Sequence, residues 1–309
     1  MKPLVKKVLI VDAVLLTLGL LYLFLLYLAP SPTPGAFVVD LEGLRRVAAA
    51  PDEALPTAVR ALKVADGKMP AFASVAGGGF HSDPCVYTAF QVVTPDAGTV
   101  IIDTAFSPGG APSLEPLLTA YSDEAFARLE SAMRGAAAIV LTHEHLDHLG
   151  GLAGSQHFPE LSSGQILMTP EQLAAAVADP LTPFTEAQAK QVTPLVYDTL
   201  YRVAPGVALQ RAPGHSPGTQ LVYVRLADGR ELLFTGDIAW HEDSIRQVRG
   251  KPRLAAAIIK EDRQAVVDQL AALEALSRAH PSLLIVVAHD ADNYRRVLAS
   301  GLVQEGFVD

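Results

Sequence analysis

The sequence predicts an α/β domain in which two β-sheets pack against each other with helices outside, preceded by one membrane-spanning helix. Strand-like and helix-like segments alternate in two successive rounds, and two packed sheets with outer helices satisfy such a pattern. A long apolar segment stands before them. Half of the 309 residues are apolar, which is ample for one sizeable domain with an appendage and too little for two large domains.

The apolar segment runs from Val8 to Ala29 and contains one charged residue, Asp12. About twenty apolar residues are enough to cross the hydrocarbon core of a bilayer. Asp12 lies near the amino-terminal end, where a carboxylate can reach the interface at a lower cost than at the bilayer centre. A cleaved signal peptide is the alternative, but it should be shorter and end in small residues. Tyr27-Leu28-Ala29 is a poor match to such an end, so we expect an uncleaved anchor.

The residues at the two ends of this segment predict its orientation. Lys2, Lys6 and Lys7 precede it, and clustered lysines favour the cytoplasmic side of a membrane. Tyr22 and Tyr27 fit an aromatic belt at the opposite interface. We therefore expect a single-pass protein of the inner (cytoplasmic) membrane with its folded domain on the periplasmic, extracytoplasmic side. The expected parts are a cytoplasmic N-terminus (1–7), a transmembrane helix (8–29), a linker (30–36) and one folded domain (37–309).

Charge and cysteine content exclude some classes of protein. The net charge is −9 and the sequence has no basic stripe, whereas binding to nucleic-acid phosphates requires clustered lysine and arginine. The expected partners are therefore a small-molecule substrate and the membrane, with no nucleic acid. The single cysteine, Cys85, excludes an internal disulfide and a cysteine-based zinc module. We expect it to be a buried apolar residue.

The first round of elements predicts an antiparallel sheet followed by a helix and a buried strand. Turn residues at Asp66-Gly67 and Pro95-Asp-Ala-Gly98 separate the strand-like segments. The helix has an acidic first turn and ends at Gly135, which are good start and stop signals. In order, the expected elements are a short helix (37–50), strands (57–65, 86–94, 98–103), a helix (123–134) and a buried strand (136–142).

The second round repeats this pattern without repeating the sequence. Two of its strands are joined across Asp228-Gly229, a typical hairpin turn. In order, the expected elements are a helix (169–178), strands (200–203, 207–212, 221–226, 231–234), an amphipathic helix (261–279), a buried strand (283–288) and a closing helix (291–300).

A cluster of metal-binding residue types directly follows the buried strand of the first round. His143, His145, Asp147 and His148 lie within six residues. A structural histidine needs one hydrogen-bond partner, so folding alone rarely requires such a cluster. A rigidly held loop after a strand is where active sites are usually found. The alternative is a solvated polar turn.

Three further potential ligands, His215, Asp237 and His289, each follow a predicted strand, and such ends meet at one edge of a sandwich. Imidazoles and carboxylates bind borderline divalent ions, and seven of them exceed what one tetrahedral zinc ion can use. We therefore expect two divalent metal ions, with zinc favoured and iron or manganese as alternatives. In the expected division, His143, His145 and His215 bind one ion, Asp147, His148 and His289 bind the other, and Asp237 and a hydroxide bridge them.

In these residues the chain resembles the metallo-β-lactamase superfamily, whose αββα sandwich carries an HxHxDH motif followed by His, Asp and His. The seven ligand positions match in order, and the similarity covers roughly residues 37–309. The resemblance implies a four-layer sandwich of two mixed sheets with outer helices. An aspartate at position 237 is typical of glyoxalase II-like thioesterases, acyl-homoserine lactonases and phosphodiesterases, so resistance to β-lactams is not the default expectation.

The resemblance also suggests a reaction. We expect a metal-dependent hydrolase in which a metal-bridging hydroxide attacks an ester, lactone or thioester carbonyl. Asp147 would orient that hydroxide and carry its proton to the leaving group. Two alternatives stay open: a phosphodiesterase that uses the same two ions, and a metal-binding sensor or scaffold without catalysis.

Two further residues are candidates for the surroundings of the metals. Asp103 stands where the superfamily has a carboxylate that braces the ligand loop, and ligating histidines commonly donate their second N–H to such a group; a strand-terminal turn residue is the alternative. Trp240 stands where some similar lactonases have a tyrosine. A tryptophan can form a wall of the pocket but cannot donate a phenolic proton.

Overall fold

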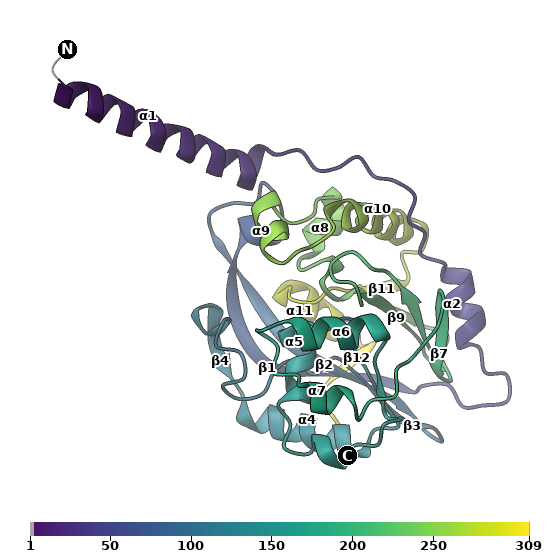
Figure 1. The fold of residues 1–309 in the computed structure, drawn as a ribbon. Coiled ribbons are helices and arrows are strands. Elements are labelled where there is room, and N and C mark those ends of the chain that lie inside the picture. Colours follow the sequence, from purple (N-terminus) through teal and green to yellow (C-terminus); the bar gives the residue numbers. More distant parts are fainter. Residues whose placement is uncertain (1–2, 309) are drawn as a thin grey trace.

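In the computed structural model, which describes residues 3–308, two mixed β-sheets form the centre of the domain (Figure 1). The first sheet has the strand order β12-β1-β2-β3-β5-β6, with β4 paired to β1. Its central strands β1, β2 and β3 are antiparallel, as expected, whereas β5, β6 and β12 join in parallel. The strands are β1 (Ala58–Pro70), β2 (Ser82–Thr94), β3 (Gly98–Ile102), β4 (Leu118–Tyr121), β5 (Ala138–Val140), β6 (Ile166–Leu167) and β12 (Val303–Glu305).

The second sheet has the strand order β11-β10-β9-β8-β7. Four of its strands form an antiparallel meander, and β11 joins β10 in parallel. The hairpin expected across Asp228-Gly229 connects β9 to β10. The strands are β7 (Leu200–Ala204), β8 (Val207–Arg211), β9 (Gln220–Arg225), β10 (Glu231–Phe234) and β11 (Leu283–Val286).

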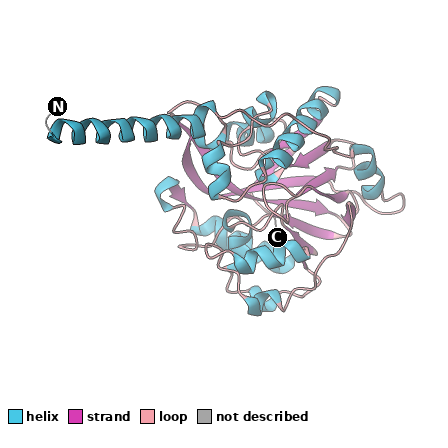
Figure 2. Cartoon of the chain, turned by 45° about the horizontal axis from the view of Figure 1, so that its top comes forward, coloured by secondary structure: helices cyan, strands magenta, loops and turns pink. Residues whose placement is uncertain are grey.

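Helices cover the outer faces of both sheets, so the expected four-layer sandwich is confirmed (Figure 2). Apolar side chains of α4, α5 and α6 pack on the first sheet, and those of α2 and α10 pack on the second. The helices of the domain are α2 (Leu41–Ala48), α3 (Ala71–Ser74), α4 (Asp123–Gly135), α5 (Leu146–Ala153), α6 (Pro170–Ala178), α7 (Glu186–Ala189), α8 (Glu242–Gln247), α9 (Arg253–Ile258), α10 (Arg263–Ala279) and α11 (Ala291–Ala299).

A third apolar layer lies between the two sheets. Val92 and Val140 of the first sheet and Leu209 of the second are completely buried in it. The rings of Phe90 and Phe234 meet edge to face across the layer, with centroids 4.8 Å apart. Cys85 is buried in the core beneath the first sheet, as expected, and burial raises the pKa of its thiol.

Capping residues explain where the principal helices begin. Ser122 accepts a hydrogen bond from the backbone of Ala125 at the start of α4. Thr169 and Gln172 form a reciprocal capping box at the start of α6. Asp262 caps α10, so this helix begins two residues later than position 261, where the sequence predicted its start.

One predicted turn was wrong. Asp66 and Gly67 do not reverse the chain, because β1 continues through them to Pro70 and pairs with β2 throughout. A shift of register between Lys63 and Ala65 bends the strand there. Gly67 is needed for close approach: a Cβ atom at this position would lie 2.9 Å from the sulfur of Cys85.

The amino-terminal segment forms a helix that projects from the domain (Figure 1). It comprises α1 (Pro3–Leu23) and a π-helical turn η1 (Phe24–Leu28), so the helix begins before the predicted position 8. The segment Val5–Leu26 is long and apolar enough to cross a membrane. A signal sequence would meet the same two criteria. Of the residues used to predict its orientation, Lys2 and the side chain of Tyr27 lie outside the described part.

Candidate metal centre

The seven predicted ligands come together at one edge of the sandwich, where strands of both sheets end. His143 and His145 follow β5, and His145 is the N-cap of α5. Asp147 and His148 lie in the first turn of α5, which the sequence had predicted as a loop. The loop after β8 carries His215, the 3-10 turn after β10 carries Asp237, and the loop after β11 carries His289.

A glycine makes this convergence possible next to Asp237. Gly236 has a φ of +51°, and a Cβ atom there would lie 2.7 Å from the side chain of Thr142. Only glycine adopts this conformation readily and leaves room for the loop that carries His143. The backbone can therefore bring Asp237 into the middle of the cluster.

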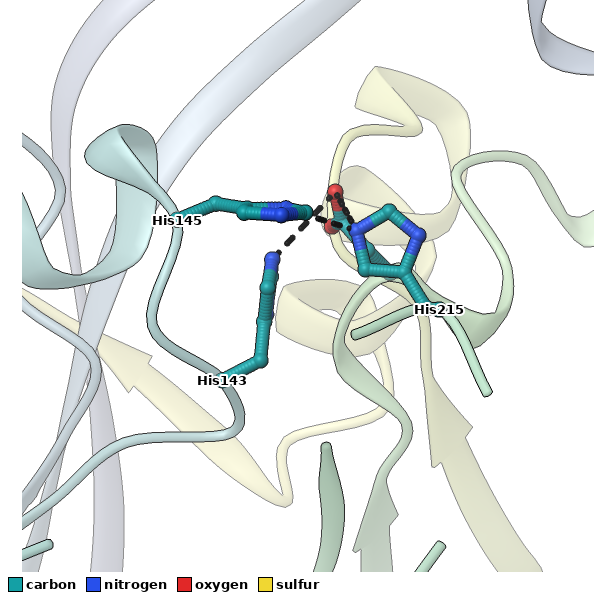
Figure 3. Close-up of side chains that lie close together, drawn as sticks. His143, His145 and His215 are labelled. Carbon is teal, nitrogen blue, oxygen red and sulfur yellow. Dashed lines mark hydrogen bonds and ion pairs between the residues drawn. The ribbon is translucent and has the colours of Figure 1, made fainter. Parts of the chain in front are cut away.

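Two groups of ligand atoms result, and Asp237 belongs to both. The first group is His143, His145, His215 and Asp237, and the second is Asp147, His148, Asp237 and His289; within each, the ligand atoms lie within 4.8 Å of one another. Figure 3 shows the imidazoles of the first group turned toward one another. The grouping is the same as the division that the sequence suggested.

Distances within the groups place Asp237 between them. Its Oδ2 lies 3.3 Å from Nε2 of His215 and 3.7 Å from Nε2 of His143. Its Oδ1 lies 3.0 Å from Nε2 of His148 and 3.1 Å from Nε2 of His289. One carboxylate oxygen thus faces each group.

The cluster fits divalent metal ions. The ring nitrogens Nε2 of His143, His148 and His289 and the Oδ1 atom of Asp237 are buried, and none has a hydrogen bond of proper geometry. Buried polar atoms are almost always paired. Four such atoms that face one another are explained if they bind cations, and imidazole and carboxylate are suitable ligands for divalent ions.

Electrostatics differ between the two groups when no metal is bound. Burial, with neighbouring histidines, lowers the pKa of His143 well below its usual value and that of His145 to about 4. In the second group burial acts in the same direction but is outweighed. Asp237 and Asp103 raise the pKa of His148 to about 10, and Asp237 and Asp147 raise that of His289 well above its usual value.

Asp103 braces the second group, as the resemblance suggested. Its Oδ2 lies 2.8 Å from Nδ1 of His148, and its two oxygens accept hydrogen bonds from the backbone N–H and the hydroxyl of Thr142. Nδ1 of His289 lies 3.0 Å from the backbone oxygen of Val86. Such partners orient an imidazole so that its other nitrogen faces the metal.

A buried ion pair braces the first group, and the sequence did not predict it. Oε2 of Glu261 lies 2.9 Å from Nδ1 of His215 and accepts a hydrogen bond of 2.8 Å from Nζ of Lys251. Nζ also donates to the backbone oxygen of Asp237 and lies 4.5 Å from the centre of the Trp240 ring. Burial opposes the ionisation of Glu261, but Lys251 and His215 hold its pKa below the usual value.

Glu144 connects the loops that carry the first group, and it was also missed. Its carboxylate is buried and accepts hydrogen bonds from the Ser216 hydroxyl (2.9 Å) and from the backbone N–H of Gly218 (3.3 Å). Burial raises its pKa. Glu144 lies between His143 and His145 in the sequence. Its hydrogen bonds with Ser216 and Gly218 therefore fix the loop of these two histidines against the loop of His215. No pattern around Glu144 or Glu261 distinguishes them from surface residues.

A cavity of about 450 Å³ opens beside the cluster. Four of the ligands, His145, Asp147, His215 and Asp237, form its polar side. Trp240 forms part of the wall, as expected, and its indole N–H donates a hydrogen bond of 2.5 Å to Oδ2 of Asp237. The remaining wall is largely apolar and includes Leu114, Leu146, Ala175, Ala178, Leu181, Ile258 and Ile259.

Comparisons with known proteins agree with this fold. The profile of the beta-lactamase superfamily domain matches residues 99–289, which is more than half of the chain. A Mycobacterium tuberculosis protein described as a probable metallo-hydrolase is 29% identical over 66% of this chain and 74% of its own length. An N-acyl homoserine lactonase of Bacillus thuringiensis is 28% identical over 41% of this chain and 50% of its own length.

Solved structures resemble the domain as well. A quorum-quenching N-acyl homoserine lactone lactonase has a TM-score of 0.58 at 17% identity, covering 79% of this chain and 96% of its own. A dizinc quorum-quenching lactonase in complex with the product N-hexanoyl-L-homoserine has a TM-score of 0.51 at 15% identity, covering 78% and 90%. At these identities the likeness shows the fold.

Proposed function

The chain belongs to the beta-lactamase superfamily and is a metal-dependent hydrolase of the dinuclear type; from this premise we propose that it is anchored in a membrane and hydrolyses an ester, a lactone or a thioester. The proposal depends most on the cavity beside the cluster. A volume of about 450 Å³ suits a small organic molecule. Its combination of metal ligands with an apolar wall suits a carbonyl compound that carries an apolar chain.

The charges around the cavity favour a carbonyl substrate over a phosphodiester. Among the described residues that line it, Lys260 is the one lysine or arginine. Arg246, Arg249 and Arg253 do not line it, and Lys251 is buried in its pair with Glu261. Glu144 and Asp179 line the same cavity, so a phosphodiester would find little cationic contact beyond Lys260 and the metal ions, and a phosphodiesterase is the weaker candidate.

The ligand set would hold two divalent ions, for which zinc is our first choice. His143, His145 and His215 would bind one ion, Asp147, His148 and His289 would bind the other, and Asp237 would bind both. When bound, two such ions polarise a carbonyl oxygen and lower the pKa of water toward neutrality. The nearness in fold to a dizinc lactonase supports zinc.

Asp147 is the residue to which we assign proton transfer. It lines the cavity, and its Oδ2 lies 3.3 Å from Nε2 of His289. Burial opposes its ionisation, but His289 and His148 keep its pKa below the usual value, so it is a carboxylate that can accept a proton. In the reaction one water adds to the carbonyl carbon, the C–O or C–S bond breaks, and the proton passes to the leaving alcohol or thiol.

The amino-terminal helix supports the membrane anchor. The side chains of its apolar segment are exposed along α1, for example Leu16 at 65%, and an exposed apolar helix of this length is stable in lipid. The lysines before it favour a cytoplasmic N-terminus. The domain would then face the periplasmic side of the inner membrane, and a protease added to spheroplasts would digest it while leaving cytoplasmic markers intact.

A substrate panel tests the proposed function. The full-length protein, loaded in turn with zinc, iron or manganese, is assayed on lactones, thioesters, phosphodiesters and a β-lactam. We expect turnover of lactones or thioesters to exceed that of the other two classes. Preference for a phosphodiester would overturn the assignment, and full metal loading with no turnover of any ester would favour a sensor or scaffold.

A further inference from the structure

The base of the amino-terminal helix is fixed to the domain. Whereas α1 is exposed, Leu26 in the last turn is 5% exposed, and this turn, η1, contacts α9 and α3. Two residues of the linker are bound to α10 as well. The backbone oxygen of Thr33 accepts a hydrogen bond from the side chain of Gln264 (2.9 Å), and the backbone N–H of Gly35 donates one to Asp268 (2.7 Å). The helix therefore defines which side of the domain lies next to a bilayer.

That side of the domain comprises α9, α3 and the segments that connect to them. The backbone N–H of Ala76, after α3, donates to the oxygen of Gly250, before α9, at 2.9 Å, so the two segments form one surface. Figure 1 shows α9 next to the end of α1 that joins the domain. We call the exposed residues of this surface, Phe80, Arg249, Arg253, Ile258 and Lys260, the juxtamembrane face.

Cations concentrate at the juxtamembrane face although the protein is acidic overall. Residues 246–263 contain two acids, Glu261 and Asp262, and six lysines or arginines. Glu261 is buried with Lys251, and Arg246 pairs with Glu242 and Asp243 just before this stretch. Arg249, Arg253 and Lys260 therefore carry the positive charge of this face, in a chain with a net charge of −9. Basic residues next to a membrane helix are attracted to anionic lipids.

Large apolar side chains lie among these cations. Phe80 is 77% exposed and Ile258 is 71% exposed. Exposed apolar side chains ringed by cations are typical of surfaces that lie in the interface of a bilayer. Phe80 packs against Phe72 of α3, with ring centroids 5.9 Å apart, so it is held on the element that also contacts the base of the helix.

The cavity of the metal centre opens at the juxtamembrane face. Ile258, Ile259 and Lys260, at the end of α9, line it. Leu114, in the loop before β4, lines it too, as does Leu181, which is 60% exposed. The apolar wall of the cavity therefore continues toward the surface that the helix places next to the bilayer.

We propose that the juxtamembrane face docks on an anionic lipid surface and that the cavity takes its substrate, an ester, lactone or thioester with a long acyl chain, directly from that bilayer. The inference rests on the proposed anchor and hydrolase function. The acyl chain passes along Leu181 and Ile258 while the carbonyl reaches the metal centre. Lys260 at the rim lies where it can contact a lipid headgroup or a polar part of the substrate.

Fluorescence quenching tests the docking without any need for catalysis. The full-length protein carries a fluorophore at Phe80→Cys or, as a control, at Val196→Cys, which is 76% exposed and precedes β7; Cys85 is buried and escapes labelling. In vesicles containing phosphatidylglycerol and spin-labelled lipids, we expect at least about twofold stronger quenching at position 80. Equal quenching at both positions would overturn the docking, whether or not the protein hydrolyses esters.

Hydrolysis in the same vesicles tests the delivery of substrate. Phe80→Asp combined with Arg249→Glu and Arg253→Glu should lower turnover of a bilayer-resident long-chain lactone by at least about fivefold. A short-chain, water-soluble lactone should be hydrolysed at an unchanged rate, and the control Lys190→Glu with Val196→Asp should affect neither. An equal loss on both lactones, or no loss on either, would contradict delivery. Strong quenching at position 80 without turnover of any ester would contradict the proposed function but would still support docking on the bilayer.

Discussion

The two halves of the metal centre hold their histidines by different means. In the first half, the carboxylate that braces His215 is Glu261, whose charge is balanced by Lys251. In the second half, Asp103 braces His148 and, among the described residues, has no lysine or arginine as a partner. Without metal, His143 and His145 of the first half are neutral near pH 7 because burial and neighbouring histidines lower their pKa. His148 and His289 of the second half carry protons because nearby aspartates raise their pKa.

Because of this difference, the two halves differ in whether their histidines must lose protons before a metal ion binds. Burial keeps His143 and His145 of the first half neutral, so these two imidazoles can bind a cation without losing a proton. The second half satisfies its carboxylates with protonated imidazoles, so His148 and His289 must each lose a proton when a cation binds. The shared ligand Asp237 belongs to both halves, and changes there should act differently from changes in either brace.

Replacement of the shared ligand should have the largest effect. Asp237→Ala removes a ligand from both halves, and we expect both ions to be lost and hydrolysis to fall by at least about a thousandfold. Metal analysis after gel filtration and the rate of ester hydrolysis measure the two effects. Glu124→Gln, which alters an exposed carboxylate on α4, is the control. Full activity in Asp237→Ala would refute a shared ligand.

Substitution of the two braces should separate the halves. Asp103→Asn removes the charge next to His148, and we expect the affinity of the second half for its ion to fall by about ten- to a hundredfold. Glu261→Gln should instead weaken the first half, through His215. Competition with a chelator, followed by cobalt absorption spectra, assigns each loss to a half. If both variants weakened the same ion, the comparison would be wrong.

Much of the centre could be predicted from the sequence because histidines and aspartates directly follow strand-like segments there. The same reasoning could not find Glu261, because its contact is with a residue 46 positions away and a glutamate at a predicted helix start is ordinary. The sequence shows Lys251 as one of several cationic residues after Trp240. Its burial, and hence its pairing, depends on packing between α9 and α10 that a local pattern does not contain.

The fold shows a similar division between local and distant causes. Long strands and capped helices such as α4 were predicted because their signals are local. The two-residue strand β6 and the three-residue strand β12 are set by pairing with β5 and β1 and have no local signal. The first turn of α5 was missed because its ligands Asp147 and His148 suggested a loop.

The affinity for metal should depend on pH more strongly in the second half than in the first. The raised pKa values of His148 and His289 mean that both are protonated at pH 7 without metal. The affinity of the second half should therefore increase as pH rises, by about tenfold per pH unit for each proton released. His143 and His145 should add little pH dependence to the first half well above the pKa of about 4 of His145, because both are already neutral there.

Calorimetry in buffers of different ionisation enthalpy measures the protons released by each binding event. Two events with the same pH dependence between pH 6 and 8 would contradict the difference between the halves. The apoprotein, stripped with a chelator and checked for intact folding by circular dichroism, is the reference state for both titrations.

The contact of Trp240 with the shared ligand should have the smallest effect. Trp240→Phe keeps an aromatic wall but removes the N–H that donates to Asp237, and it weakens the contact with Lys251. A hydrogen bond to a charged group contributes about 1.5–3 kcal/mol, part of which water can replace in the open cavity. We expect kcat/KM to fall by about three- to tenfold with the metal content unchanged. A loss of one ion would instead make Trp240 part of the metal support.

The pair of cations itself can be observed most directly by anomalous scattering from crystals of the zinc-loaded protein. Data collected on both sides of the zinc absorption edge should give two peaks about 3.5–4 Å apart. One should lie among His143, His145 and His215, the other among Asp147, His148 and His289, with Asp237 between them. A single peak, or peaks remote from Asp237, would contradict a dinuclear centre built from these seven side chains.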